Sequence, residues 1–407
     1  MGTMASSTHQ FGVLDLIRAG LQDLDTARTL LDELRADGID DDRLCLLMKT
    51  LEQTCEPDIA LRNLVDIIKA LQSQGRDFHQ VITDDAGLVR LVTVLGVSDE
   101  MGKLMRFRPE LVMAAASDSC ESHLYNHAQR RAHVLEAVGA DPADNRMPKA
   151  TKPLAEAATA LRQTYRKQLA AIMAQDATAD DPIEIQPRIS QELSDLADAA
   201  LEGALAIARD EVDGSEHVRF AIIGMGKLGA RELNYVSDVD LIYVVEPADV
   251  DTNGMTLNRV GTKMATTLQR VCQSVIMGVA EPTLWQIDGG LRPEGKDGPL
   301  VRKLESHEAY YEQWAENWEF QALLKARPVA GDPDLGQAYM DMTRPFVWTA
   351  SKRDNFVYDC QQMRKRVEDL IPAPLKDREI KLGRGGLRDV EFTVQMLQLV
   401  HLSLIHI

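Results

Sequence analysis

VRFAIIGMGKLGARELNYVSDVDLIYVV, residues 218–245, is the stretch of this 407-residue chain that decides its fold. Two apolar runs, Val218–Ile223 and Leu241–Val245, have the length and continuous hydrophobicity of buried strands. A glycine-rich turn begins at Gly224 between them, and Asp238 and Asp240 stand directly before the second run. The pattern predicts a small α/β unit that carries a glycine loop and paired carboxylates.

Helical periodicity surrounds this unit on both sides. The other expected elements are helices over 11–34, 59–71, 88–95, 124–138, 154–173, 189–212, 256–277 and after about 306, loops over 139–153 and 176–187, and a third strand over 283–287. The sequence therefore predicts an α+β fold that is mostly helical.

The composition limits the class of partner and the compartment. The chain carries 45 lysines and arginines against 63 acids, a formal net charge of −18. Because such a chain repels phosphate backbones and anionic lipids, we expect no nucleic-acid and no membrane partner. No run approaches the roughly 20 apolar residues that span a bilayer, and residues 1–10 lack signal-peptide features. Five cysteines without a Cys-x-x-Cys pair predict free thiols in a cytoplasmic protein.

The spacing of Gly224, Gly226 and Gly229 matches the G-x-G-x-x-G fingerprint of dinucleotide-binding folds. Those folds need a full crossover helix and an acid at the end of the second strand. Here residues 230–237 leave room for only about two helical turns, and the acids precede the strand. A Walker-type loop does not fit either, because Ala230 follows the last glycine. Both interpretations are therefore disfavoured.

The two aspartates suit a metal-dependent nucleotidyl-transfer site. Side chains two apart in a strand share one face, so Asp238 and Asp240 are expected to lie close together. Two such carboxylates repel each other unless a cation lies between them, and oxygen ligands suit Mg²⁺, with Mn²⁺ as the alternative. Asp288 follows the third predicted strand and is the candidate third ligand. An isolated Asp-x-Asp is more often a solvated strand edge; the glycine loop, the apolar strand and the third acid favour the metal site.

Phosphate contacts are expected beside these acids. The glycines at 224 and 226 would let the backbone approach a nucleotide phosphate, and amides of the short helix that follows would face the anion. Lys227 or Ser237 would add a direct contact. We therefore include Gly224, Gly226, Lys227 and Ser237 in the predicted nucleotide site.

Residues 224–243 resemble the nucleotidyltransferase signature of the glutamine synthetase adenylyltransferase/deadenylase family. The resemblance covers roughly residues 85–400, and further blocks agree in order. These blocks are LRPEG at 291–295, GPL at 298–300, WEFQALLKAR at 318–327, AGD at 330–332 and IKLGRGGLRDVEF at 380–392.

The resemblance implies a polymerase-β-like nucleotidyltransferase core at 191–335, between helical regions at 1–190 and 336–407. Family members carry two such halves: one removes AMP from a tyrosine of glutamine synthetase by phosphorolysis, and the other adenylylates it with ATP. The Gly-Met-Gly start and the Pro-Glu-Gly segment resemble the N-terminal, adenylyl-removing half. The resemblance further implies phosphate and ADP or ATP as substrate or product, and Mg²⁺ at Asp238, Asp240 and Asp288. It implies glutamine synthetase as protein substrate, a nitrogen-regulatory PII protein as partner and glutamine as effector.

Two other functions remain open at this point. One is ATP-dependent adenylylation of glutamine synthetase, and the other is a catalytically silent module that binds nucleotide or PII. Three crowded carboxylates argue against the silent module, because a site without function has no physical reason to keep them.

Phosphorolysis needs fixed cations, and Arg292, Lys325 and Arg327 are the candidates. An equally good interpretation of the two arginines is structural, in ion pairs with Glu294 and Glu319.

The block at 380–392 holds further charges. Asp389 and Glu391 are better explained by stabilisation in a first helical turn than by catalysis. Arg384 and Arg388 lie near enough in sequence to reach a phosphate.

Two features depart from the family pattern. Gly289-Gly290 stand where many relatives have a larger residue and an arginine, which removes one possible phosphate contact. Residues 390–407 end on an open apolar stripe, and 402–407 do not continue the pattern. We therefore expect the chain to be a fragment cut inside its C-terminal helical region.

Overall fold

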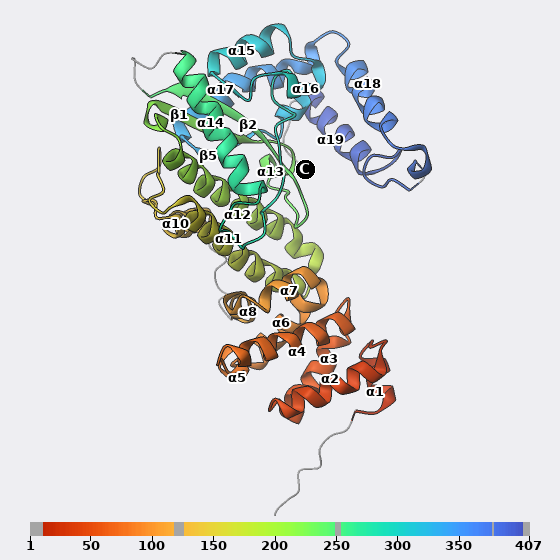
Figure 1. Ribbon diagram of the computed structural model, residues 1–407. Helices are drawn as coiled ribbons and strands as arrows, with labels where there is room; N and C mark the ends of the chain where they lie inside the picture. The colour runs from red at the N-terminus through yellow and green to blue at the C-terminus, as the bar shows by residue number, and fades with distance from the viewer. Residues whose placement is uncertain (1–10, 118–125, 249–253, 377, 402–407) are drawn as a thin grey trace, which may run out of the picture. The chain divides into compact units, whose positions relative to one another are not determined.

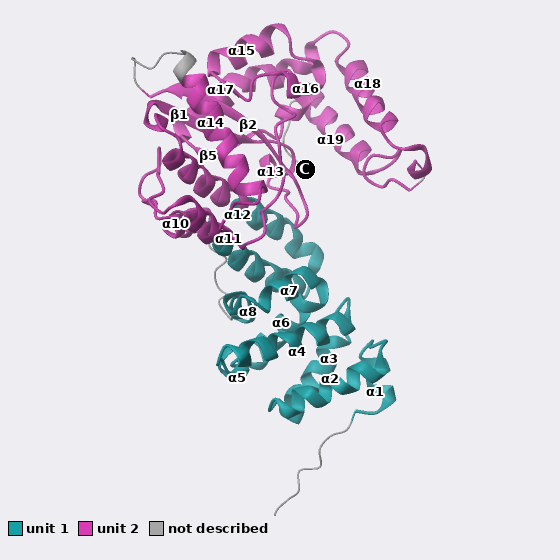
Figure 2. Ribbon diagram, in the orientation of Figure 1, with its two compact units in different colours: residues 1–126, 163–196 teal, residues 127–162, 197–407 magenta. Residues whose placement is uncertain are grey.

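The computed structural model describes residues 11–117, 126–248, 254–376 and 378–401. The chain forms two compact units (Figure 2), unit 1 with residues 1–126 and 163–196, and unit 2 with residues 127–162 and 197–407. The long helices α11 (Leu154–Ala177) and α12 (Pro182–Glu211) contribute residues to both. The predicted boundaries of the nucleotidyltransferase core, at residues 191 and 335, are not tested by this division into two units and stay a prediction.

Unit 1 is helical throughout its described residues. Besides parts of α11 and α12 it contains α1 (Val13–Arg18), α2 (Leu24–Ala36), α3 (Asp41–Leu51), α4 (Pro57–Ser73), α5 (Phe78–Val81), α6 (Asp85–Val97), α7 (Asp99–Met105) and α8 (Pro109–Ala116). The apolar stripe predicted at 59–71 is buried in the core of this unit, in α4. The single helix predicted over 11–34 is wrong: Gly20 adopts φ +79°, and Asp23 caps a new helix by accepting from the Thr26 amide at 3.1 Å.

The acidic segment 176–187 was expected to be a loop, and most of it is helix. α11 continues to Ala177, and α12 begins at Pro182. A proline at the first helical position loses no hydrogen bond, and Asp181 caps the helix by accepting from the Ile183 amide at 2.9 Å. Pro182 therefore starts the helix, and Pro187 is accommodated inside it.

Unit 2 contains a mixed sheet of five short strands. They are β1 (Val218–Gly224), β2 (Val239–Pro247), β3 (Ile287–Asp288), β4 (Val301–Arg302) and β5 (Arg327–Gly331). β1 pairs antiparallel with β2 and β5, and β3 and β4 both pair parallel with β2. The two strands predicted within residues 218–245 are confirmed. The third predicted strand is wrong in extent, since only Ile287 and Asp288 pair, and β4 and β5 were not predicted.

Helices cover both faces of this sheet (Figure 1). Besides parts of α11 and α12, the described helices of unit 2 are α10 (His127–Val138), α13 (Gly226–Gly229), α14 (Gly254–Gln273), α15 (Leu304–Gln313), α16 (Asn317–Leu323), α17 (Pro333–Thr349), α18 (Phe356–Asp369) and α19 (Leu387–His401). On one face Ala221 and Ile223 share a core with α15 to α18. On the other face Val245 lies against Gly261 of α14, where an added Cβ would be 3.0 Å away. The sheet is therefore buried on both sides, as its continuous apolar strands predict.

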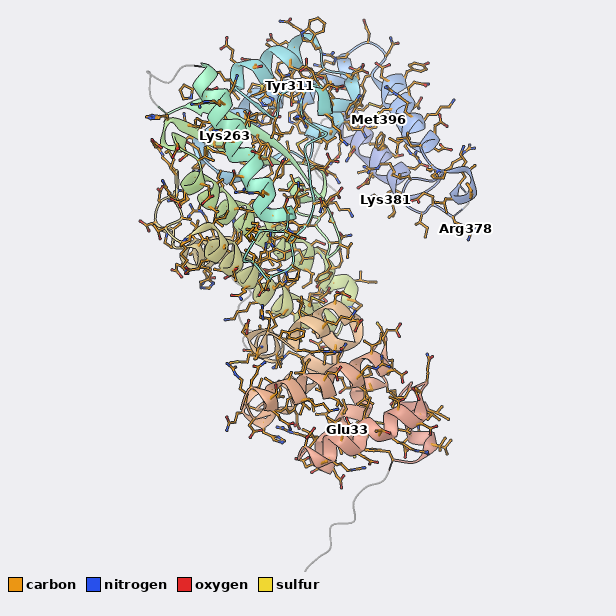
Figure 3. The ribbon with its side chains drawn as sticks, in the orientation of Figure 1. Glu33, Lys263, Tyr311, Arg378, Lys381 and Met396 are labelled. Atoms are coloured by element: carbon orange, nitrogen blue, oxygen red, sulfur yellow. The ribbon has the colours of Figure 1, made fainter. Side chains whose placement is uncertain are left out.

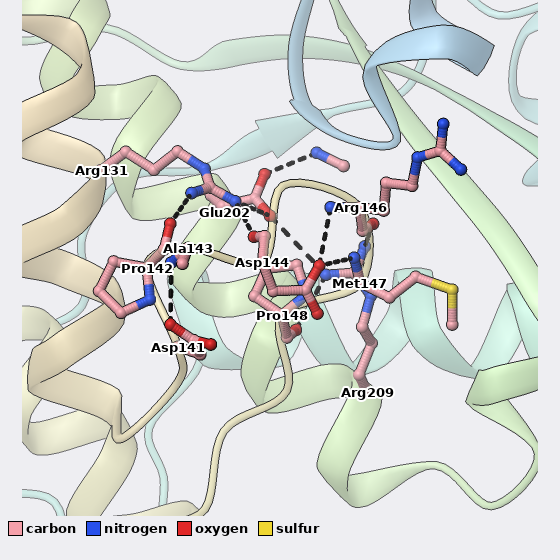
Figure 4. Close-up of polar contacts among 11 residues, drawn as sticks. Arg131, Asp141, Pro142, Ala143, Asp144, Arg146, Met147, Pro148, Glu202 and Arg209 are labelled. Carbon is pink, nitrogen blue, oxygen red and sulfur yellow. Dashed lines mark hydrogen bonds and ion pairs between the residues drawn. The ribbon is translucent and has the colours of Figure 1, made fainter.

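The predicted loop at 139–153 is confirmed, and one arginine each from α10 and α12 fixes it (Figure 4). Arg131 donates to the carbonyls of Pro142 at 2.9 Å and Asp144 at 2.6 Å, and Arg209 donates to Pro148 at 3.0 Å. Glu202 of α12 lies 3.7 Å from both guanidinium groups. The loop is thus held to α10 and α12 by charge-assisted hydrogen bonds.

Among the described residues, no helix is both long and apolar enough to cross a bilayer.

Candidate active site

Asp240 and Asp288 occupy matched positions on neighbouring parallel strands. Asp240 is the second residue of β2, and the register pairs it with Asp288 of β3. Asp238 directly precedes β2, with its backbone fixed by the Val239 amide, which donates to the Gln286 carbonyl at 3.0 Å. The three acids singled out by the sequence are therefore brought to one edge of the sheet.

The carboxylates of Asp238 and Asp240 accept no hydrogen bond from the part of the chain that the structure describes. Asp238 is exposed and Asp240 is half-buried. Burial, followed by the charges of Asp238 and Asp288, raises the pKa of Asp240 to about 6, against the opposing charges of Arg388 and Lys381. A partly desolvated carboxylate beside two others is a strained arrangement that positive charge relieves.

The glycine loop is shaped by the protein's own close contacts. Gly226 has φ +53°, and an added Cβ would lie 2.5 Å from the Asp240 Oδ2 atom. At Gly229 an added Cβ would meet the Lys325 carbonyl oxygen at 1.8 Å. Gly224 ends β1 and would place its Cβ 2.6 Å from Val329. These glycines let α13 lie tightly between the acids and the segment before β5; a phosphate contact at Gly224 or Gly226 stays a prediction.

The other two residues predicted for nucleotide binding lie near the acids in sequence and differ in setting. Lys227 is half-buried in α13, and its carbonyl accepts from the Glu232 amide at 2.8 Å. Ser237 donates from its hydroxyl to the Asp238 carbonyl at 2.8 Å. That bond fixes the turn that leads into Asp238, and direct phosphate contact by either side chain stays a prediction.

The loop after Asp288 is closed by Arg292. Its guanidinium donates to the carbonyls of Gly289 at 2.7 Å, Lys296 at 3.2 Å and Gly298 at 3.1 Å. The Gly290 amide donates to Asp288 Oδ1 at 2.7 Å. The expected ion pair of Arg292 with Glu294 is wrong, since Glu294 pairs with Arg302. Arg292 therefore shapes the loop that carries Asp288.

The remaining two predicted cations hold the other end of α13. Arg327 makes a bidentate bridge to Asp198 at 2.6 and 3.0 Å and donates to the carbonyls of Leu228 and Gly229 at 3.0 and 3.2 Å. The expected partner of Arg327, Glu319, was wrong. Lys325 lies 2.8 Å from a Glu232 oxygen. Both cations thus have carboxylate partners.

Two cations near Asp240 come from the far end of unit 2. Lys381 lies in the loop that leads into α19 (Figure 3), and Arg388 lies in the first turn of that helix. Both oppose the rise in the pKa of Asp240 through their charge. The sequence indicated that Arg388 could reach a phosphate but assigned no role to Lys381. The Gly-Arg-Gly-Gly run between them was the available signal.

A pocket of about 460 Å³ lies at the end of α13, opposite Gly226. Its lining includes Gly229 and Ala230, Lys325 and Arg327, and residues 390, 391, 394, 395 and 398 of α19. The start of α19 therefore lies next to the short helix whose other end contacts Asp240.

Near this pocket Asp389 lies in the first turn of α19, as expected. It accepts from Arg364, which holds the pKa of its carboxyl below the usual value. Its role is therefore explained by the structure of the loop.

A small mixed sheet with clustered carboxylates at one edge and helices on both faces defines a nucleotidyltransferase-like α+β domain. The model of the glutamate-ammonia ligase adenylyltransferase family matches residues 88–342, and the chain belongs to that family. A second model, the GlnD PII-uridylyltransferase, matches residues 361–406.

Similar proteins carry one name, bifunctional glutamine synthetase adenylyltransferase/adenylyl-removing enzyme. The protein of Bifidobacterium longum (strain DJO10A) is 76% identical over 398 residues, which are 98% of this chain and 37% of the relative. That of Cutibacterium acnes is 43% identical over 95% of this chain and 39% of its own length. The Streptomyces coelicolor protein is 41% identical over 95% of this chain and 37% of its own length. The chain thus spans less than half the length of these relatives.

Proposed function

We propose that this chain removes AMP from the adenylyl-tyrosine of glutamine synthetase by Mg²⁺-dependent phosphorolysis, releases ADP, and thereby regulates nitrogen assimilation. The matched register of Asp240 and Asp288, with Asp238 directly before β2, carries the proposal. Three carboxylates at one sheet edge are what metal-dependent transfer of a nucleotidyl group requires. The relatives' shared name supplies glutamine synthetase as the protein substrate.

The residues present fit a divalent cation. The donors are carboxylate oxygens, which suit Mg²⁺ and Mn²⁺. Asp238 and Asp240 have free acceptor capacity within the described residues, and the pKa of Asp240, raised to about 6, reflects the cost of leaving the group charged and buried without a cation. We propose Asp238, Asp240 and Asp288 as the ligands, and bound divalent ions would supply positive charge to the phosphoryl oxygens.

The chain's own residues position the reaction. Gly226 lets the backbone of α13 approach Asp240, and Arg292 fixes the loop behind Asp288. Both arrangements keep the acids in place before substrate binds, so that little reorganisation is needed during transfer.

The step itself balances without a further reactant. An oxygen of hydrogenphosphate bonds to the adenylyl phosphorus, and the bond from phosphorus to the tyrosine oxygen breaks. The tyrosine oxygen leaves with the bonding electron pair and gains the proton that the hydrogenphosphate gives up. The products are ADP and unmodified tyrosine.

The Gly-Met-Gly start and the Pro-Glu-Gly segment support the adenylyl-removing direction, because they resemble that half of the family. A PII protein is the proposed regulatory partner, with glutamine as effector; the match of residues 361–406 to a PII-uridylyltransferase model supports the link to PII. Free thiols at the four described cysteines fit a cytoplasmic location.

The test uses this chain, Mg²⁺ and adenylylated glutamine synthetase, with and without inorganic phosphate, and follows ADP by chromatography. ADP that requires phosphate supports the proposal. Label from ATP entering unmodified glutamine synthetase, without ADP release in the first assay, would establish the adenylylating direction instead. Absence of both reactions in a folded chain would favour a silent regulatory module.

A further inference from the structure

Three of the four cations that the sequence singles out beside the acids are occupied by the protein itself. Arg292 donates to three loop carbonyls. Lys325 lies 2.8 Å from a Glu232 oxygen, and Arg327 bridges to Asp198. The fourth cation is the ammonium group of the lysine at position 227, in α13.

Asn234 holds the Lys227 ammonium at the turn that leads into Asp238. The orientation of the Asn234 side-chain amide that satisfies both of its polar groups places Oδ1 3.2 Å from Lys227 Nζ. In the same orientation Nδ2 donates to the Val236 carbonyl at 2.9 Å. Val236 stands two residues before Asp238, and the Ser237 hydroxyl fixes the step between them by donating to the Asp238 carbonyl at 2.8 Å. The ammonium is therefore tied to the segment that carries this acid.

The backbone of Lys227 starts beside the second acid. The Met225 amide donates to the Asp240 carbonyl at 2.8 Å. Gly226 lies so close to Asp240 that an added Cβ would be 2.5 Å from its Oδ2 atom. Lys227 is the next residue of α13, and its carbonyl accepts from the Glu232 amide at 2.8 Å. Hydrogen bonds and close packing thus anchor both ends of this lysine to segments that carry the acids.

The partner of the Lys227 ammonium is neutral. An ammonium group has three donors, and the Asn234 amide oxygen takes one of them. Within the described residues no carboxylate pairs with Lys227. A phosphate that approaches three carboxylates is repelled unless a cation holds it, and lysine supplies a compact positive charge for that purpose. The Lys227 ammonium therefore keeps the charge and the donors that a phosphoryl oxygen requires.

We propose that Lys227 donates to a phosphoryl oxygen of the substrate beside the three acids, and that Asn234 is the positioning residue that fixes its ammonium group. The inference rests on the proposed function for its ligand and on the hydrogen bonds of Asn234 for its residues. Inorganic phosphate and the adenylyl group both present such oxygens, and the experiment distinguishes them.

The test is calorimetric titration of the full chain, in the presence of Mg²⁺, with inorganic phosphate and separately with AMP. Lys227→Met is expected to weaken the binding of at least one of these ligands by about tenfold or more, because a charged hydrogen bond is lost. Lys263→Met is the matched control: it makes the same change at an exposed lysine of α14 and should bind both ligands like the original chain.

Asn234→Asp tests the neutral partner at an exposed position, so it keeps the experiment decisive if Lys227→Met does not fold. The new carboxylate would pair with the Lys227 ammonium, as Glu232 pairs with Lys325, and should weaken binding of the same ligand. Asn258→Asp, at an exposed asparagine of α14, adds the same charge and should leave binding unchanged.

A double-mutant cycle tests positioning. Asn234→Ala should weaken binding severalfold in the original chain and cause no further loss in Lys227→Met. If Asn234 had only a structural role, its loss would appear in both backgrounds.

A loss of phosphate binding would identify the attacking phosphate as the ligand, and a loss of AMP binding would identify the adenylyl group. Equal binding of both ligands by Lys227→Met and the original chain, or binding of neither by the original chain, would overturn the inference. Turnover separates the two proposals. A chain that binds a ligand through Lys227 but releases no ADP from adenylylated glutamine synthetase contradicts the proposed function alone. Phosphate-dependent ADP release that Lys227→Met leaves unchanged contradicts the role of Lys227 alone.

Discussion

Asp240 and Asp288 stand at the same register position of β2 and β3, although 47 residues separate them in the chain. Parallel pairing of two residues of β3 is enough to bring the third acid to the first two. The carboxylate cluster is thus a product of the sheet, and it depends on the turns that fix β3 and α13 against β2.

Repulsion within this cluster predicts how stability changes with pH in metal-free buffer. The pKa of Asp240 is raised to about 6, so its contribution favours folding below pH ~4 and is lost as pH rises through 6. Asp240→Asn has no carboxylate to ionise, so this variant should not lose that stability as the pH rises. The variant should match the original chain near pH 4 and exceed its free energy of unfolding by on the order of 2 kcal/mol at pH 7.5.

Urea titration with chelator, followed by tryptophan fluorescence, measures this difference, because all four tryptophans lie in unit 2. Asp297→Asn, at an exposed acid of the neighbouring loop, is the control and should show no such pH dependence. A variant that is less stable than the original chain at pH 7.5 without metal would contradict the account of Asp240.

Gly226 couples the glycine loop to the acids. Gly226→Ala places a Cβ 2.5 Å from Asp240 Oδ2 at a residue with φ +53°. We expect a stability loss of about 1–2 kcal/mol and at least a tenfold loss of Mn²⁺ affinity, because Asp240 must move. Gly75→Ala is the control for backbone strain alone, because Gly75 has φ +72° but nothing lies within 4 Å of an added Cβ that could be displaced. Equal Mn²⁺ affinity in both variants would show that Gly226 does not position Asp240.

Arg327 is expected to stabilise unit 2. Arg327→Met removes the guanidinium from Asp198, whose side chain is fully buried, and from the carbonyls that end α13. The loss should be about 3 kcal/mol in urea unfolding. Arg146→Met breaks another arginine–aspartate bridge, to Asp334, whose side chains are 71% and 63% exposed, and should cost less than about 1 kcal/mol. Similar losses in the two variants would contradict a structural role specific to Arg327.

The sequence predicted those parts of the fold that are determined by a few consecutive residues. β1, β2 and the loop at 139–153 follow from apolar runs and prolines that act over a few residues. β4 and β3 have two residues each, too few for any periodicity, and exist only because β2 offers them hydrogen bonds. Propensity was overridden at 182–187, where a capping aspartate and a proline at the first helical position start α12.

The candidate site shows the same division. Asp238 and Asp240 are two positions apart in the sequence and were identifiable from that spacing. Arg292 and Arg327 were identifiable as charges, but their partners are carbonyl groups and Asp198, which only tertiary contact reveals. The backbones of Lys381 and Arg388 are joined by a hydrogen bond across a loop that closes at Gly386, a contact that no periodicity in the sequence indicates.

The central claim is that Asp238, Asp240 and Asp288 together bind the divalent ions of this site. Electron paramagnetic resonance of Mn²⁺ titrated into the full chain at pH 7.5 tests it directly, with Asp240→Asn, Asp288→Asn and the Asp297→Asn control in parallel. We predict stoichiometric binding of one or two ions by the original chain and by the control, and at least a tenfold loss of affinity in each of the other variants. Mn²⁺ binding that is equally tight in Asp240→Asn and Asp288→Asn would place the metal elsewhere and contradict the account.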